Sequence, residues 1–170
     1  MKKLFLVLAL AFAGIFTANA QVWIGGSANA LVNKDVTRIN AAPEIGFCIP
    51  NSNWTIAVGA NYGFRQVNQD DDAPLTTHSV ILSPYVRYTI CSIEKFALMM
   101  DLTGDLDVTS EKFGYRVGLQ PCIAWMATEH WTAAFRFAFI GYNQCNFYGD
   151  KGFCLDFATA APGFGLYYNF

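Results

Sequence analysis

The first residues that could carry chemistry are a histidine and a serine side by side. Thr77-His78-Ser79 precedes an alternating segment, and Asp70-Asp71-Asp72 supplies carboxylates nearby. A His–Ser pair with an acidic orienter activates serine for acyl transfer, the chemistry of a lipid-modifying enzyme. Adjacent residues of a strand point to opposite faces, however, so His78 is not placed to serve Ser79. We therefore expect no enzymatic activity and interpret His78 as a solvated histidine at a rim.

Five cysteines form the second chemical group. Cys145 and Cys154 lie nine positions apart in one long polar segment. In an oxidising compartment a disulfide between them would close that segment, and we expect one. Cys48, Cys91 and Cys122 leave an odd number, so at least one cysteine stays free or pairs between chains. Their connectivity is open, a bridge between Cys48 and Cys91 included.

Metal and cofactor sites are not predicted. The only two histidines, His78 and His130, fall at opposite ends of the expected fold, which disfavours zinc. The aspartate run at residues 70–72 has the oxygen ligands that a hard divalent cation prefers. We interpret it instead as a solvated loop tip and expect neither metal nor cofactor.

The N-terminus resembles an export signal. Lys2 and Lys3 form a charged region, residues 4–16 are apolar, and Ala18-Asn19-Ala20 has the pattern of a cleavage site. These features predict a signal peptide over residues 1–20 and a mature domain over residues 21–170. A membrane anchor is the alternative, but the segment is short for one.

Composition narrows the class of the mature chain. The 170 residues are 54% apolar and 16% aromatic with a net charge of −2, which predicts one domain and no nucleic-acid partner. Beyond Gln21 no run of about 18 uncharged apolar residues occurs, so no transmembrane helix is predicted. The aromatic residues must therefore lie in another kind of structure.

Period-two alternation dominates the rest of the sequence and predicts strands. From Trp54 to Arg65, for example, large apolar residues alternate with small or polar ones. Eight such segments occur, each about as long as a tilted strand needs to cross a bilayer. They cover residues 22–32, 41–49, 54–65, 79–90, 96–103, 113–125, 131–139 and 163–170. The predicted fold is all-β, an eight-stranded antiparallel up-and-down transmembrane β-barrel.

The two faces of these strands differ in a way that favours a membrane barrel. A soluble barrel keeps bulky apolar residues inside, whereas a membrane barrel turns them towards lipid. The polar face carries charges of both signs, which are tolerated inside only if paired. We therefore predict an ion-pair plug that fills the lumen, a narrow pore being the alternative. Its candidates are Glu44, Arg65, Arg87, Asp101, Arg116 and Arg136.

Connection lengths and aromatic positions point the same way. Short connections are expected at residues 50–53, 91–93 and 127–130, and long polar ones at residues 33–40, 67–77, 105–112 and 143–153. This alternation is typical of short periplasmic turns and longer external loops. Aromatic residues favour the membrane interface, so we expect two belts. The periplasmic belt comprises Trp23, Trp54, Trp125 and Trp131, and the outer one Tyr62, Phe64, Phe113, Tyr115 and Phe139.

The C-terminus carries a family resemblance. Residues 165–170, Gly-Leu-Tyr-Tyr-Asn-Phe, end in an aromatic residue and resemble the assembly signal of outer-membrane barrels, with Phe164, Leu166, Tyr168 and Phe170 in the alternating row. The whole of residues 21–170 resembles small barrels of the OmpA/OmpX type and porin-like barrels of Bacteroidetes-like bacteria.

The resemblance implies a location in the outer membrane of a Gram-negative bacterium. It implies as partners the barrel-assembly machinery, membrane lipid and lipopolysaccharide. A monomeric scaffold that presents its external loops is then expected, above all the loop at residues 143–153. A soluble binding barrel in the periplasm is the competing hypothesis.

Overall fold

The computed structural model describes residues 21–32, 34–67, 75–109, 114–149, 151–157 and 163–170. The predicted signal peptide and the aspartate run at residues 70–72 lie outside this described part. Within it the chain consists of strands and one short 3-10 turn. No helix of the described residues is long and apolar enough to span a membrane.

Ten strand segments follow one another along the chain. They are β1 (Val22–Val32), β2 (Val36–Cys48), β3 (Trp54–Val67), β4 (Leu75–Ile93), β5 (Phe96–Asp107), β6 (Gly114–Met126), β7 (Trp131–Arg136), β8 (Phe139–Asn143), β9 (Gly152–Asp156) and β10 (Gly163–Asn169), with the 3-10 turn η1 (Asn146–Tyr148) between β8 and β9.

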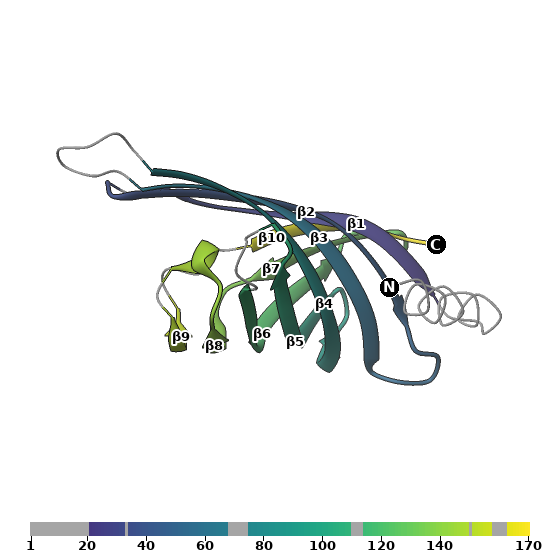
Figure 1. Cartoon of the computed structure of the whole chain (residues 1–170). Helices are drawn as coiled ribbons and strands as arrows, with labels where there is room; N and C mark the ends of the chain where they lie inside the picture. The colour runs from purple at the N-terminus through teal and green to yellow at the C-terminus, as the bar shows by residue number, and fades with distance from the viewer. Residues whose placement is uncertain (1–20, 33, 68–74, 110–113, 150, 158–162) are drawn as a thin grey trace, which may run out of the picture.

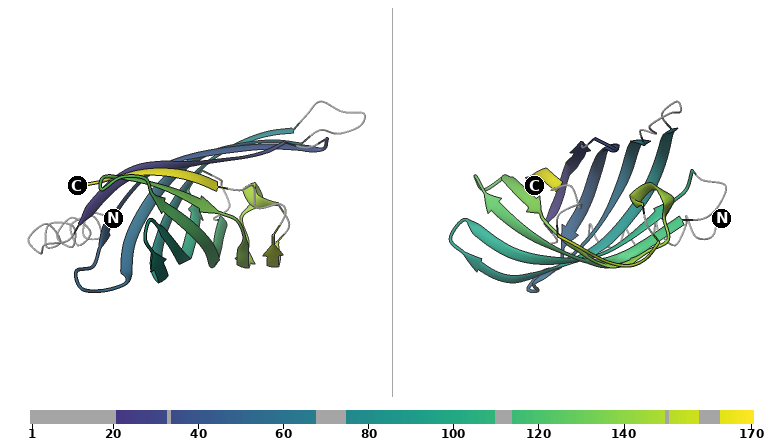
Figure 2. Two further views of the ribbon diagram at one scale, coloured as in Figure 1. Left: turned by 180° about the vertical axis from the view of Figure 1, so that it is seen from behind. Right: turned by 90° about the vertical axis from the view of Figure 1, so that its left-hand side faces the viewer.

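These segments close into a barrel with eight strand positions (Figures 1 and 2). Strands β1 to β6 pair antiparallel in chain order. Both β7 and β8 pair with β6 and share the seventh position. The eighth position is shared by β9, which pairs with β8, and β10, which pairs with β7 and closes the ring on β1. The prediction of an all-β, eight-stranded antiparallel up-and-down barrel is confirmed.

Burial alternates along each strand and turns the large apolar residues outward. One outward row runs through neighbouring strands in register, from Val86 to Leu102 to Leu119. The adjacent inward row pairs Arg87 with Asp101 and Asp101 with Gln120. The predicted apolar faces are therefore outside the barrel, and the predicted polar faces line its lumen.

The two ends of the barrel differ in their connections. At one end, called here the turn end, the chain turns at residues 49–53, 94–95 and 127–130. The opposite end is called the loop end, and there β1 to β4 reach well beyond the other strands (Figure 1). The first loop was predicted too long, because β2 begins at Val36 instead of near residue 41.

A β-bulge divides the seventh position into β7 and β8. Leu119 pairs with Ile140 and Cys122 with Arg136, so the partner strand carries one extra residue across this stretch. Pro121 lies opposite the bulge and has no N–H to donate to a ladder. Its carbonyl still accepts a hydrogen bond from the Phe137 amide at 3.4 Å. An extra residue reverses the facing of the residues that follow it.

The bulge overturns the prediction for Phe139. Instead of facing outward in an aromatic belt, the Phe139 side chain is 0% exposed. The guanidinium carbon of Arg116 lies 3.4 Å from the centre of its ring. The sequence alternation was extended through Phe139 without the extra residue, which is why the predicted side was wrong.

Trp23 is a second correction. It was placed in the periplasmic belt, but it is 4% exposed and packs edge-on against Tyr167 at 4.8 Å inside the barrel. Trp54, Trp125 and Trp131 do face outward at the turn end. Trp23 belongs to the inward row of β1, since its neighbours Val22 and Ile24 are the more exposed residues.

Candidate functional site

The centre of the lumen holds two carboxylates and two guanidiniums. Arg87 binds Asp101 with both Nε, at 2.7 Å, and Nη2, at 2.8 Å. Arg136 spans the barrel from β7, with Nε 3.2 Å from Asp101 and Nη1 and Nη2 each 3.0 Å from the Glu44 carboxylate. Four residues from β2, β4, β5 and β7 thus form one neutral layer, called here the ion layer.

Glu44 accepts further hydrogen bonds from hydroxyl groups around the ion layer. Tyr85 donates to it at 2.6 Å and Tyr167 at 3.2 Å, and Ser27 donates from the neighbouring strand β1. Arg136 also donates to the Tyr85 hydroxyl at 3.2 Å. Buried charges are tolerated when each is paired and its remaining hydrogen-bonding capacity is met. Each charge of the ion layer is paired, so the layer can fill the lumen and fix strand register.

A second polar group lies nearer the loop end. Asp105 accepts hydrogen bonds from Ser83 at 2.6 Å and from Thr103 at 3.4 Å, and Arg116 approaches it at 3.7 Å. Asp107 accepts from Ser79 at 3.3 Å. These side chains point into the lumen like those of the ion layer. Arg116 lies between Asp105 and the ring of Phe139.

The segment from Cys145 to Tyr148 folds into the barrel at the loop end. Phe147, on η1, is 1% exposed and contacts the backbone of Gly63 on β3. Arg65 donates to the Asn146 carbonyl at 2.6 Å, and Arg38 to the Tyr148 carbonyl at 3.3 Å. This segment, called here the inner loop, was predicted to project outward. The structure places it inside, where apolar and aromatic side chains find partners.

The predicted interior charges therefore have different surroundings. Glu44, Arg87, Asp101 and Arg136 come together in the ion layer, and Arg116 joins Asp105. Arg65 is half-buried and binds a backbone carbonyl of the inner loop. Arg38, Asp105, Tyr85 and Tyr167 were not among the candidates. The alternation that places the charges inside also places Asp105, Tyr85 and Tyr167 inside, so it could have identified these three residues. It could not have identified Arg38, which precedes the predicted start of its strand.

The predicted disulfide is not formed, since all five cysteines are free. Cys145 is fully buried in the inner loop, and its thiol points at the Asp107 carboxylate, 3.8 Å away. Cys154 lies on β9 opposite Gly141. Burial raises the pKa of the Cys145 thiol, which disfavours the reactive thiolate. The inward fold of the segment thus separates the two sulfurs that the sequence places in one loop.

His78 and Ser79 lie on opposite sides of the wall. Ser79 is buried and points at Asp107, whereas His78 is exposed, 2.9 Å from the Tyr62 hydroxyl and edge-on to Phe64. They form no catalytic pair. Among the residues that the structure describes, no three His, Cys, Asp or Glu side chains gather to hold a metal ion.

The C-terminal strand has the predicted facing. Phe164, Leu166 and Phe170 are exposed on the outside and Tyr168 is half-buried, while Tyr167 between them points into the lumen. No protein-family model and no curated protein matches the sequence of this chain.

Among the described residues, a space in the lumen lies on each side of the ion layer. The space towards the loop end is about 70 Å³ and is lined by polar groups, Asn61 and Asp105 among them. The space at the turn end is about 700 Å³. Glu44, Asp101 and Arg136 line the first, and Arg87 lines the second, so the ion layer separates them.

Proposed function

We propose that this chain is a non-enzymatic scaffold in the outer membrane of a Gram-negative bacterium, with a closed lumen. The observation that carries the proposal is the inversion of the barrel: large apolar side chains outside and paired charges inside. Soluble barrels have the reverse arrangement, and membrane barrels this one. The scaffold holds its loop end towards the outside of the cell, where the long wall of strands β1 to β4 offers a surface for recognition.

The outer surface supports the membrane location. The outward row from Val86 through Leu102 to Leu119 continues to Ile140 without a charged residue. A second outward row joins Leu98, Ile123, Phe135 and Phe164. Monomeric soluble proteins rarely expose apolar patches above several hundred Å². A continuous apolar surface on most of the strands requires a lipid environment or a large covering partner.

The closed lumen supports a scaffold over a pore. The ion layer spans the barrel at its centre, and the inner loop occupies the loop end. The spaces described on its two sides both end at the ion layer. We therefore expect no conductance steps when the purified protein is inserted into planar bilayers. Steady channels in the wild-type protein would instead favour the pore.

Location is tested by a pair of charge substitutions. Leu102→Arg puts a charge on the outside at mid-strand, where a membrane barrel loses about 2–4 kcal/mol of stability. Ile93→Arg puts it at the turn end, where the cost in a membrane falls to about 0–1 kcal/mol. In a soluble barrel both would be nearly neutral.

The readouts are cell fractionation and the gel mobility of boiled and unboiled samples. The wild-type protein and Ile93→Arg should be found in the membrane fraction, with mobility that changes on boiling. Leu102→Arg should show less of the folded band. Wild-type protein in the soluble fraction with no change of mobility would refute the proposal.

A further inference from the structure

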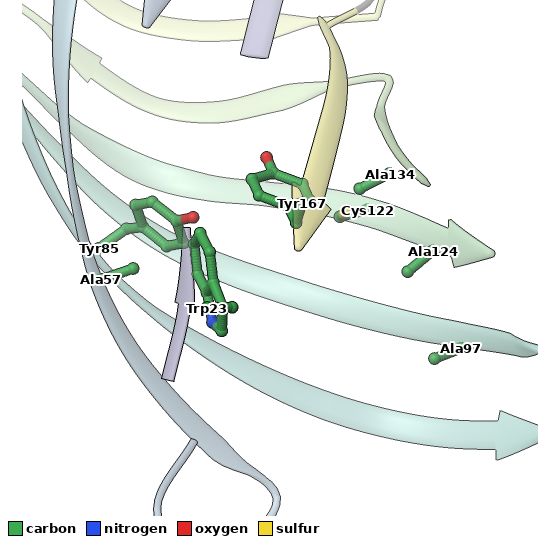
Figure 3. Close-up of a cluster of buried hydrophobic side chains, with 8 residues drawn as sticks. All are labelled: Trp23, Ala57, Tyr85, Ala97, Cys122, Ala124, Ala134 and Tyr167. Carbon is green, nitrogen blue, oxygen red and sulfur yellow. The ribbon is translucent and has the colours of Figure 1, made fainter. Parts of the chain in front are cut away.

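Small side chains leave room in the lumen at the turn end. Ala97, Ala124 and Ala134 face one another in register across β5, β6 and β7, and all three point inward. Figure 3 shows them as short side chains on these strands, while the rings of Trp23 and Tyr167 project towards the middle. The three alanines are buried and pack with the two aromatic rings in one cluster.

A pocket of about 700 Å³ adjoins this cluster, because Trp23 and Tyr167 belong to both, and its volume is within the range of sites that hold small molecules. Each strand position of the barrel contributes to it, so its wall is continuous. Its apolar lining comes from Trp23, Met99, Met126 and Tyr167, and its polar residues include Gln21, Thr128 and Asn169. The floor is the ion layer, and the mouth opens at the turn end.

Arg87 supplies a fixed cation in the pocket wall. It is only 6% exposed, and Asp101 holds it through Nε and Nη2. A guanidinium has five N–H donors, and these two bonds use two of them. The rings of Tyr85 and Tyr167 lie within 6.0 Å of its central carbon. The other charged residues of the pocket are Lys95 and Glu129, which have opposite signs.

We propose that the turn-end pocket binds a small amphiphilic acid, with an apolar body and one carboxylate or similar anionic group. The apolar body lies against the aromatic and methionine side chains. The anionic group accepts hydrogen bonds from Arg87. A preformed wall and a guanidinium already oriented by Asp101 lower the ordering cost of binding. The inference concerns the lumen alone and holds for a barrel in a membrane or in solution.

The test is a titration of the folded protein with 2-naphthoate, followed by the methionine methyl signals in NMR. Met99 and Met126 line the pocket, whereas Met100 lies on the opposite face of β5. We expect saturable shifts of the Met99 and Met126 signals and none of Met100. Neutral 2-naphthamide should bind about ten-fold more weakly, because it lacks the charge-assisted hydrogen bond. Equal affinity for both probes would overturn the role of Arg87.

Two variants test the site of binding. Thr132→Trp fills the pocket from its wall and should abolish the shifts, and Ala133→Phe, on the outer face next to Trp125, should leave them unchanged. If Thr132→Trp fails to fold, Thr89→Trp at the pocket wall serves the same purpose. Shifts that persist in the filled variant, or that appear equally at Met100, would show partition into detergent or the outer surface and refute the proposal. Absence of any shift in the wild-type protein would refute it as well.

Discussion

Replacement of Arg136 by leucine is the most informative perturbation of the ion layer. Arg136 makes two bonds to Glu44 and one each to Asp101 and the Tyr85 hydroxyl. Asp101 keeps Arg87 after the substitution, but Glu44 keeps only hydroxyl donors. Removal of one partner from a buried ion pair costs about 3–5 kcal/mol, because the other charge stays buried and uncompensated. We expect Arg136→Leu to lose about that much unfolding free energy.

The second substitution Glu44→Gln removes the stranded charge. The double variant should therefore be more stable than the sum of the two single losses predicts, with a coupling of about 2 kcal/mol or more. Urea unfolding followed by tryptophan fluorescence measures all three free energies. Lys95→Leu, in an exposed turn, is the control and should change stability by less than about 0.5 kcal/mol. Additive losses, or a loss below about 1 kcal/mol for Arg136→Leu, would refute the ion layer as a coupled unit.

Two further predictions concern the inner loop and the bulge. Gly63→Ala adds a methyl group against the Phe147 ring, so the inner loop should be displaced and Cys145 should become accessible to alkylation, which peptide mass spectrometry measures. Gly104→Ala is the control, because its added methyl group meets nothing closer than the Pro84 carbonyl oxygen at 3.9 Å. Cys145 should stay protected in this variant. Equal labelling in both variants would contradict the packing of Phe147. Phe139→Ala should lose about 3–5 kcal/mol in the same urea assay, because the ring is fully buried under Arg116. Phe135→Ala, on the outside, should lose clearly less, and similar losses would mean that the bulge does not turn Phe139 inward.

The alternation of residue types was sufficient to predict the barrel. Side chains of a strand alternate between the two faces of the sheet with a period of two. Apolar residues at one set of alternate positions and charged residues at the other are therefore visible directly in the sequence. That parity also selected Glu44, Arg87, Asp101 and Arg136, which the structure brings together. Which carboxylate meets which guanidinium depends on strand register and on the width of the barrel, and neither is visible in a local pattern.

The errors arise where the alternation changes phase, or where the facing of a residue depends on which strand pairs with its own. The bulge before Phe139 depends on Pro121 of β6 facing that stretch, a relation that only the pairing of the strands reveals. Trp23 is out of phase with Val22 and Ile24, which left the facing of β1 open, and its place in the belt was assigned from its position at a strand end. Its contact with Tyr167 of the closing strand β10 lies inside the barrel, and only the pairing of the strands reveals it.

The inward position of the inner loop has an electrostatic reason that connects it to strand register. Arg38 and Arg65 are direct partners across β2 and β3, and like charges in such a pair destabilise a sheet. Each of them donates to a backbone carbonyl of the inner loop, Arg65 to Asn146 and Arg38 to Tyr148. Two carbonyl acceptors can therefore offset the repulsion, while burial of Phe147 adds apolar contact. The arginine pair and the inner loop each stabilise the position of the other. For this reason the sequence of neither segment alone predicted that the inner loop folds into the barrel.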